Sequence, residues 1–249
     1  MTTKRHHQAG FTLVEIAMVL LIVALLLGGL VPTLSGQIEQ RRVSETRKQL
    51  DEIQQALLGY AVSNKHLPCP AKSASDGTES RNVATGTCTG NTRVGFLPWA
   101  ELGVSKTDSW GRIFIYSASN TFTNSTTPFT LTSNRDITIK TRDATGALIN
   151  LSKSTDIPAV ILSTGTNGIF GTTDSGSTIS SAAPTGTNNV ADQKSNIDGT
   201  VAGGAPGTTF MSRDPAAPAN STDESFDDLV VWLSPNTLFN RMVAAGQLP

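Results

Sequence analysis

The chain has 249 residues and a formal net charge of −1, so no bulk electrostatic attraction to nucleic acid is predicted. The length suffices for one or two domains with a substantial hydrophobic core. Charged residues make up 16% of the chain and aromatic residues 6%, while Gly, Ser, Thr and Asn are abundant, a composition more typical of an exported, β-rich domain than of a helical cytosolic enzyme.

The N-terminal region divides into a polar leader, residues 1–10, and an apolar segment from Phe11 to Leu34. The apolar segment is long enough to span a bilayer, and Glu15 is its only charged residue. Lys4 and Arg5 precede it, which favours a cytoplasmic N-terminus. An ionised carboxylate is costly in lipid, so Glu15 is a candidate functional residue.

Two ordinary interpretations of this region are a cleaved secretory signal and a plain signal anchor. A secretory signal combines a basic start, an apolar middle and a small-residue cleavage site. Here the apolar middle is unusually long, and VPTLSG is a poor substitute for an A-x-A cleavage site. Neither interpretation explains Glu15 or the abrupt junction between Gly10 and Phe11.

A third interpretation explains both features. The string KRHHQAG followed by FTLVE resembles the class III signal of type IV pilins and type II secretion pseudopilins. In that family a membrane peptidase cuts after the glycine, on the cytoplasmic side, and methylates the new N-terminal residue. The resemblance therefore implies cleavage between Gly10 and Phe11, N-methylation of Phe11 and retention of the apolar helix. Glu15 takes the place of the family's glutamate.

The resemblance also suggests a role for Glu15 in assembly. Cleavage creates an amine at Phe11, one helical turn from Glu15, and negative charge is favourable near a helix N-terminus. In a filament, the Glu15 carboxylate of one subunit would instead neutralise the amine of its neighbour. An ion pair is tolerable in an apolar medium only when both partners are present, so the pair would fix the register of each added subunit. The alternative is an interfacial side chain that merely reaches the lipid headgroups.

The helical pattern continues beyond the apolar segment. One amphipathic stripe has helical spacing: Val43, Leu50, Ile53, Leu57 and Tyr60. Four acids and four bases are mixed between Glu39 and Glu52, which indicates a solvated face with i,i+3 and i,i+4 pairs. Asn64 and Pro68 are stop signals, so the helix is expected to end near Ser63. Residues 28–32 (GGLVP) interrupt its middle, and the proline is expected to kink it.

The two cysteines, Cys69 and Cys88, both lie after the apolar segment. If that segment directs export of the rest of the chain, both thiols reach an oxidising compartment and can form a disulfide. Two unpaired thiols are the alternative. Only three histidines are present, and His6 and His7 lie in the leader, so no metal site and no cofactor are predicted.

Residues 65–249 are predicted to form a β-rich head. Five segments have strand-like composition: Arg112–Ser117, Phe129–Ser133, Asp136–Thr141, Ala159–Ser163 and Asp228–Leu233. The third alternates apolar and polar residues, and the last two are apolar runs typical of strands buried on both faces. A final helix is expected with Ser234 as its N-cap, Pro235 as its first residue and Gly246 as its stop.

The motif TDSWGRIFIY, which begins at Thr107, resembles the D-x-W-G segment of pseudopilins, where a turn leads into the first strand of the sheet. In such a turn Asp108 can accept hydrogen bonds from backbone amides, and Gly111 permits an unusual backbone dihedral. Residues 171–209 are rich in Ser, Thr, Gly and Asn, so a flexible loop is expected there, with a display surface as the alternative.

Some pseudopilins hold calcium in a C-terminal loop, and five aspartates offer suitable oxygens: Asp192, Asp198, Asp223, Asp227 and Asp228. They show no D-x-D-x-D-G spacing, so an acidic solvated loop is expected. No G-x-S-x-G, H-E-x-x-H or Cys/His dyad is present, and His66 is the sole histidine after removal of the leader. No catalytic residue is predicted.

These observations predict an α+β, pilin-like fold in which a long N-terminal helix, residues 11–64, packs on an antiparallel β-rich head, residues 65–249. Its first half, residues 11–34, would span the bacterial inner membrane, with a cytoplasmic N-terminus and a periplasmic head, before entering a pilus or pseudopilus. Expected partners are the prepilin peptidase/methyltransferase, other pilin or pseudopilin subunits, the inner-membrane assembly platform and lipid. The predicted role is a structural subunit, in the form of a minor pilin or a pseudopilin. The alternative is a membrane-anchored periplasmic enzyme or binding protein that never polymerises.

Overall fold

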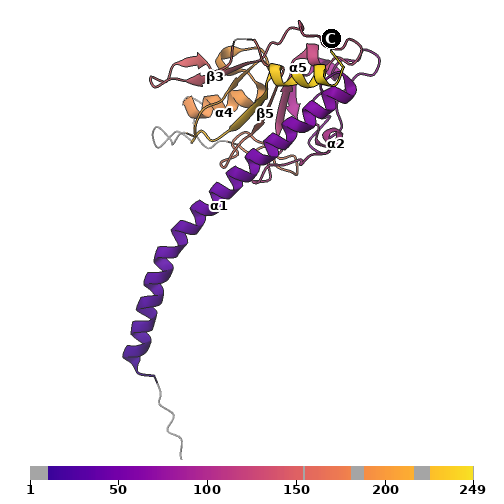
Figure 1. The fold of residues 1–249 in the computed structure, drawn as a ribbon. Coiled ribbons are helices and arrows are strands. Elements are labelled where there is room, and N and C mark those ends of the chain that lie inside the picture. Colours follow the sequence, from indigo (N-terminus) through magenta and orange to yellow (C-terminus); the bar gives the residue numbers. More distant parts are fainter. Residues whose placement is uncertain (1–10, 154, 181–187, 216–224, 249) are drawn as a thin grey trace, which may run out of the picture. The chain divides into compact units, whose positions relative to one another are not determined.

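The computed structural model describes residues 11–153, 155–180, 188–215 and 225–248, with the backbone alone described at 26–35 and 202. The chain divides into two compact units, Met1–Arg42 and Val43–Pro249. The predicted leader, residues 1–10, lies outside the described residues. Figure 1 labels several of the elements and colours the chain by residue number.

Helix α1 extends over Leu13–Asn64 and so contributes to both units. The backbone is helical through residues 28–32, where an interruption was expected. Its end agrees with the prediction, because Lys65 adopts a left-handed conformation with φ of 64° and its amide donates to the carbonyl of Ala61. A left-handed residue just past the last turn is a common helix stop.

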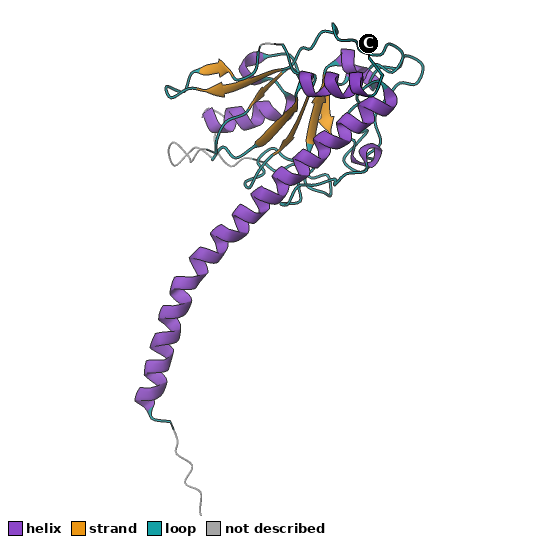
Figure 2. Cartoon of the chain, viewed as in Figure 1, coloured by secondary structure: helices purple, strands orange, loops and turns teal. Residues whose placement is uncertain are grey.

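In the second unit, the amphipathic stripe of α1 is buried as predicted. Leu50, Ile53 and Leu57 are buried in the main hydrophobic cluster, together with Phe114 and Ile161 from the sheet. The same cluster contains Leu238 and Met242 of α5 (Pro235–Ala244). Burial of this stripe, worth about 2 kcal/mol for each large aliphatic side chain, joins this part of α1 to the head. Figure 2 shows this stretch of helix crossing the strands.

A four-stranded antiparallel sheet has the order β1-β2-β5-β7. Its strands are β1 (Val94–Phe96), β2 (Ile115–Ala118), β5 (Ala159–Ser163) and β7 (Leu229–Leu233). β5 is buried along its whole length, as its continuous apolar run predicted. β2 begins at Ile115, three residues later than the predicted strand, because Arg112 and Ile113 form only isolated bridges.

A smaller sheet has the order β4-β3-β6. It consists of β3 (Thr138–Arg142), β4 (Leu148–Asn150) and β6 (Thr209–Met211). β3 and β4 are antiparallel, but β3 and β6 are parallel, so the head is not antiparallel throughout. Ile137, Ile139 and Phe210 form a second hydrophobic cluster with residues of the larger sheet.

Two predictions in the head are wrong. Residues 129–133 form a turn rather than a strand: the amide of Ser133 donates to the carbonyl of Thr130, and Phe129 is buried by stacking on Phe122. Residues 171–209 do not form one flexible loop, because they contain α4 (Asn188–Asp198), η2 (Val201–Gly203) and the start of β6. Residues 181–187 of that region lie outside the described part.

Three short helical elements complete the head: η1 (Thr89–Asn91), α2 (Trp99–Leu102) and α3 (Asn120–Thr123). The predicted C-terminal helix is confirmed as α5, with Pro235 in its first turn and Ser234 as N-cap residue. The Ser234 side chain makes no capping hydrogen bond. Gly246 has a φ of 68°, which suits its predicted role as the helix stop.

Candidate functional site

The candidate processing region begins at the first described residue. Phe11 lies just before α1 and is 83% exposed. Gly10 lies outside the described residues, so cleavage between Gly10 and Phe11 stays a prediction, as does methylation of Phe11. Among the described residues, therefore, none packs closely over the predicted new N-terminus at Phe11.

Glu15 belongs to a capping box at the start of α1. Its Oε2 accepts hydrogen bonds from the backbone amide and the hydroxyl of Thr12, each at 3.0 Å. In return, the amide of Glu15 donates to the Thr12 hydroxyl at 3.2 Å. This reciprocal exchange satisfies two backbone donors that have no partner inside the helix. The T-x-x-E spacing is a recognisable signal for this arrangement, although the expectation for Glu15 rested on its charge and its place in the motif.

The first turns of α1 expose apolar side chains on every side. The exposed large residues between Phe11 and Leu25 are Leu13, Val14, Ile16, Met18, Val19, Leu20, Leu21, Ile22 and Val23. The three hydrophobic clusters of the described residues lie in the second unit. Within the part of the chain that the structure describes, no helix combines the length and the apolar character needed to cross a membrane.

The D-x-W-G turn adopts the geometry that the sequence predicted. Oδ1 of Asp108 accepts hydrogen bonds from the amides of Trp110 and Arg112, both at 2.9 Å, and Gly111 has a φ of 81°. Oδ2 accepts from the Ser163 hydroxyl at 2.6 Å, which joins the turn to the end of β5. Burial raises the pKa of Asp108, although these hydrogen bonds favour the ionised form. The turn therefore has a structural role, because it connects the segment before β2 to the end of β5.

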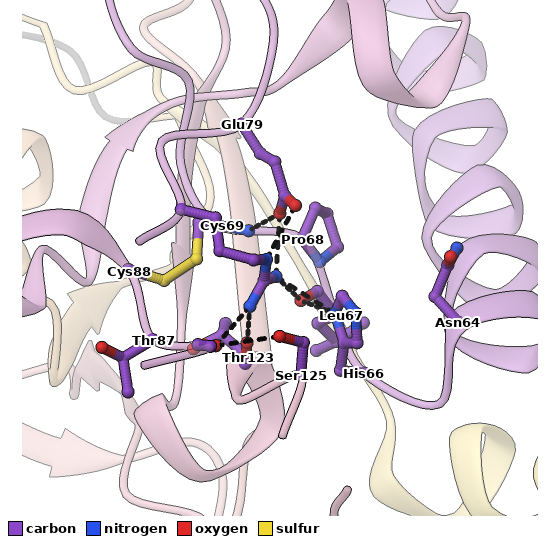
Figure 3. Close-up of polar contacts among 12 residues, drawn as sticks. Asn64, His66, Leu67, Pro68, Cys69, Glu79, Thr87, Cys88, Thr123 and Ser125 are labelled. Atoms are coloured by element: carbon purple, nitrogen blue, oxygen red, sulfur yellow. Dashed lines mark hydrogen bonds and ion pairs between the residues drawn. A yellow bond between two sulfur atoms is a disulfide. The ribbon is translucent and has the colours of Figure 1, made fainter. Parts of the chain in front are cut away.

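A second polar cluster surrounds the disulfide. Cys69 and Cys88 are joined, as predicted, and both are buried. Arg81, inside the closed loop, donates to Glu79 Oε1 at 2.7 Å and Oε2 at 2.8 Å, and to the carbonyls of Gly86 and Thr123. Its guanidinium thus links the disulfide loop to α3, because Thr123 lies in that helix. Figure 3 shows the disulfide together with Glu79 and Thr123.

His66 lies in the same cluster and is buried. Its Nδ1 is 3.1 Å from Nη2 of Arg81 and 3.0 Å from the carbonyl oxygen of Leu67 (Figure 3). Burial lowers the pKa of His66, and the positive charge of Arg81 lowers it further. The lowered pKa favours a neutral ring, whose Nδ1 contacts both Arg81 and the Leu67 carbonyl, and that carbonyl also accepts a hydrogen bond from Arg81. This lone histidine has a structural partner and does not form a catalytic dyad in the described residues.

The aspartates considered for calcium are not gathered into one site. Asp192 accepts two hydrogen bonds from Arg142 at 2.8 Å. Asp227 accepts from the amide of Asn167, and Asp228 accepts from Asn196. Asp198 accepts from Thr200, and Asp223 lies outside the described residues. No group of three or more potential metal-binding side chains occurs among the residues that the structure describes.

Comparison with known proteins identifies the N-terminal region. Residues 5–31 match the family model described as the prokaryotic N-terminal methylation motif. The match includes the predicted cleavage junction, Phe11 and Glu15, and it covers the apolar part of α1 up to Val31. No curated protein and no solved structure matches the chain.

Proposed function

We propose that this chain is a structural subunit of a type IV pilus or a type II secretion pseudopilus, because its N-terminal methylation motif supports a type IV pilin-like or pseudopilin-like precursor. In this proposal the chain is a minor pilin or a pseudopilin, made as a precursor. The prepilin peptidase/methyltransferase cuts it after Gly10 and methylates Phe11. The large head, with two sheets, favours a minor subunit over a small major one.

The observation that carries this proposal is the methylation motif in front of an exposed apolar helix. In the sequence, residues 11–34 contain one charge, and the described side chains from Phe11 to Leu25 are exposed. An apolar surface of this extent requires lipid or other protein chains to cover it. We propose that lipid covers it first, in the inner membrane, and that neighbouring subunits cover it in the filament.

The proposed steps assign Glu15 two successive sets of partners. In the isolated chain its carboxylate accepts from Thr12 and caps α1. In the filament it faces the positive amine that cleavage creates on Phe11 of a neighbouring subunit. A buried carboxylate without a cation is strongly disfavoured, so a misregistered subunit would bind less tightly than a correctly placed one.

The proposed location rests on the same features. Lys4 and Arg5 favour a cytoplasmic N-terminus, which places the head in the periplasm. The Cys69–Cys88 disulfide is compatible with that oxidising compartment. The proposed partners are the peptidase, other pilin or pseudopilin subunits, the inner-membrane assembly platform and membrane lipid.

Co-expression with and without a prepilin peptidase tests the processing step. The peptidase should shorten the chain by its first ten residues and add one methyl group, both detected by intact mass. Gly10→Leu should block this change because the peptidase needs a residue without a side chain there, whereas the control Ala9→Ser should not. A wild-type chain that stays full length with an active peptidase would support a plain anchor. A chain that starts after residue 34 would indicate ordinary secretion.

A further inference from the structure

Two adjacent arginines, Arg41 and Arg42, lie on α1 at the end of the first unit. Both residues are exposed, and neither forms an ion pair within the described part of α1, where the ion pair that is present joins Lys48 to Glu52. A guanidinium stays charged at every physiological pH and presents five N–H donors in one plane. The two side chains are therefore available to an anionic ligand outside this chain.

The position of this arginine pair along α1 matches the thickness of a bilayer. Arg41 lies 30 residues after Phe11, and the backbone between them is helical from Leu13 onward. At 1.5 Å per residue this distance is about 45 Å, whereas a bilayer with both headgroup layers measures roughly 40–45 Å. A helix with Arg41 in the headgroups of one leaflet therefore places Phe11 at the outer surface of the other leaflet.

The apolar segment alone does not define this depth. Residues 11–34 would extend about 36 Å as a helix, although the hydrocarbon core is only about 30 Å thick. Ile38, beyond the segment, is also exposed and apolar. A shift of one helical turn along the membrane normal therefore changes the buried apolar surface little. Charged groups next to the segment then decide its depth, because they have to remain in the headgroup layer.

The chemistry of the arginine pair favours phosphate as its ligand. Guanidinium groups form paired, charge-assisted hydrogen bonds with phosphate oxygens. Phospholipid headgroups present phosphates at the depth where the helix length places Arg41, and a long side chain can reach them while its stem covers apolar surface. Each basic residue close to an anionic membrane surface typically strengthens its attraction about fivefold.

We propose that Arg41 and Arg42 bind the phosphate groups of anionic phospholipids in the periplasmic leaflet and thereby set the depth of α1 in the membrane. The junction between Gly10 and Phe11 then lies at the cytoplasmic surface, where the prepilin peptidase would cut. This inference rests on the proposed function for the membrane location of residues 11–34. It adds a lipid ligand and a positioning role for two residues that lie outside the methylation motif, residues 5–31.

Lipid binding by the full-length chain tests the ligand directly. The chain is reconstituted in nanodiscs of phosphatidylethanolamine and phosphatidylglycerol, and retained phosphatidylglycerol is measured by native mass spectrometry. Arg41→Gln with Arg42→Gln should weaken its binding about 25-fold, about fivefold for each charge. The matched control is Arg47→Gln with Lys48→Gln, which removes two adjacent charges about 9 Å farther along α1 and should leave binding within about twofold.

Cleavage by a prepilin peptidase in the same nanodiscs tests the positioning role. The initial rate of leader removal should fall about fivefold or more for the Gln pair at 41 and 42, because fewer chains hold the junction at the membrane surface. The control pair at 47 and 48 should be cleaved at the wild-type rate. Arg41→Lys with Arg42→Lys keeps both charges and should recover most of the binding and the rate. Lys and Gln have similar helix propensities, so this difference reports on charge and not on helix stability.

The outcomes separate this inference from the proposed function. If the wild-type chain is cleaved and the Gln pair at 41 and 42 binds phosphatidylglycerol and is cleaved like the wild type, the lipid inference is overturned and the proposed function stands. A loss of filament incorporation alone would overturn it too, because the arginines would then contact an acidic neighbouring chain. Weaker lipid binding with an unchanged cleavage rate would overturn the positioning role. A wild-type chain that carbonate extracts from membranes would overturn both proposals.

Discussion

The side chains of Thr12 and Glu15 exchange hydrogen bonds across the first turn of α1. Glu15 accepts from the amide and hydroxyl of Thr12 at 3.0 Å, and the Thr12 hydroxyl accepts from the Glu15 amide at 3.2 Å. Both residues lie directly after the predicted cleavage junction, inside the methylation motif. The carboxylate proposed to pair with a neighbouring amine is therefore already held at the helix start by a local partner.

Replacement of Glu15 by Ala should separate insertion from assembly. The variant keeps the apolar segment, so membrane insertion should be unchanged, whereas incorporation into filaments should fall strongly because the neighbouring amine loses its partner. Fractionation and immunoblotting of sheared filaments measure both. The control Glu45→Ala removes an exposed charge farther along α1 and should assemble normally. Normal incorporation of Glu15→Ala would refute the proposed role.

Loss of the capping threonine should have a smaller effect than loss of Glu15. Thr12→Val removes the hydroxyl while keeping the shape of the side chain, and a lost N-cap typically costs about 1 kcal/mol of helix stability. Glu15 would remain available for its neighbour, so filaments should form in reduced amount. Helix fraying is measured by hydrogen exchange of the amides of Glu15 and Ile16, which bond to the Thr12 hydroxyl and the Thr12 carbonyl. If Thr12→Val blocked assembly as completely as Glu15→Ala, the capping box rather than the intersubunit pair would be the essential contact.

Opening of the disulfide should destabilise the head. The loop between Cys69 and Cys88 spans 19 positions, and closure of a loop of this length is worth about 3 kcal/mol on the chain-entropy model. Cys69→Ser with Cys88→Ser should lower the free energy of unfolding by roughly this amount in denaturant titrations. The same titration of the wild-type chain with a reductant provides the control. Equal stability of all three samples would contradict a stabilising role for the disulfide.

Arg81 should contribute more to stability than an exposed ion pair. Arg81→Met leaves the mostly buried carboxylate of Glu79 without its cation and removes hydrogen bonds to three carbonyls, a change that typically costs about 3 kcal/mol or more. The control Lys72→Met breaks an exposed pair with Asp76 and should cost less than about 1 kcal/mol. Chemical denaturation measures both. A smaller loss for Arg81→Met than for Lys72→Met would contradict this assignment.

His66 should make the head less stable in mild acid. Its pKa is lowered in the folded state from an ordinary value of 6.5, chiefly by burial. Below that value the unfolded chain binds a proton that the folded chain resists, so the free energy of unfolding decreases as the pH falls. Between about pH 7.5 and pH 5.5, the wild-type chain should therefore lose more stability than His66→Gln, as measured by thermal unfolding. Parallel pH profiles of the two chains would exclude this role.

Several elements could be predicted because local sequence alone determines them. β5 is indicated by a run of apolar residues, and α5 by a serine, a proline and a closing glycine. The Asp108 turn is indicated by a short side chain that bonds amides two and four residues ahead. The amphipathic stripe of α1 likewise defines the face that packs on the sheet.

Other elements depend on contacts that no local pattern encodes. α4 has few apolar residues, and it is held instead by buried polar groups: Asn196 bonds the backbone of Met211 and the side chain of Asp228. Residues 129–133 resembled a strand in the sequence, but Phe129 lies in a turn and is buried by stacking on Phe122. The Arg81 cluster joins segments more than forty residues apart, from Arg81 to Thr123. The capping box of Glu15, by contrast, has a local signal in the T-x-x-E spacing of Thr12 and Glu15, which the prediction for Glu15 did not use.

The most direct measurement is the mass spectrum of the N-terminal peptide of this chain, recovered from sheared filaments or pseudopili of the native host. The proposed function predicts a peptide that begins at N-methylated Phe11 and still contains Glu15 and the apolar segment. A peptide that begins at Met1, or a chain that starts after Leu34, would contradict the proposed processing and assembly.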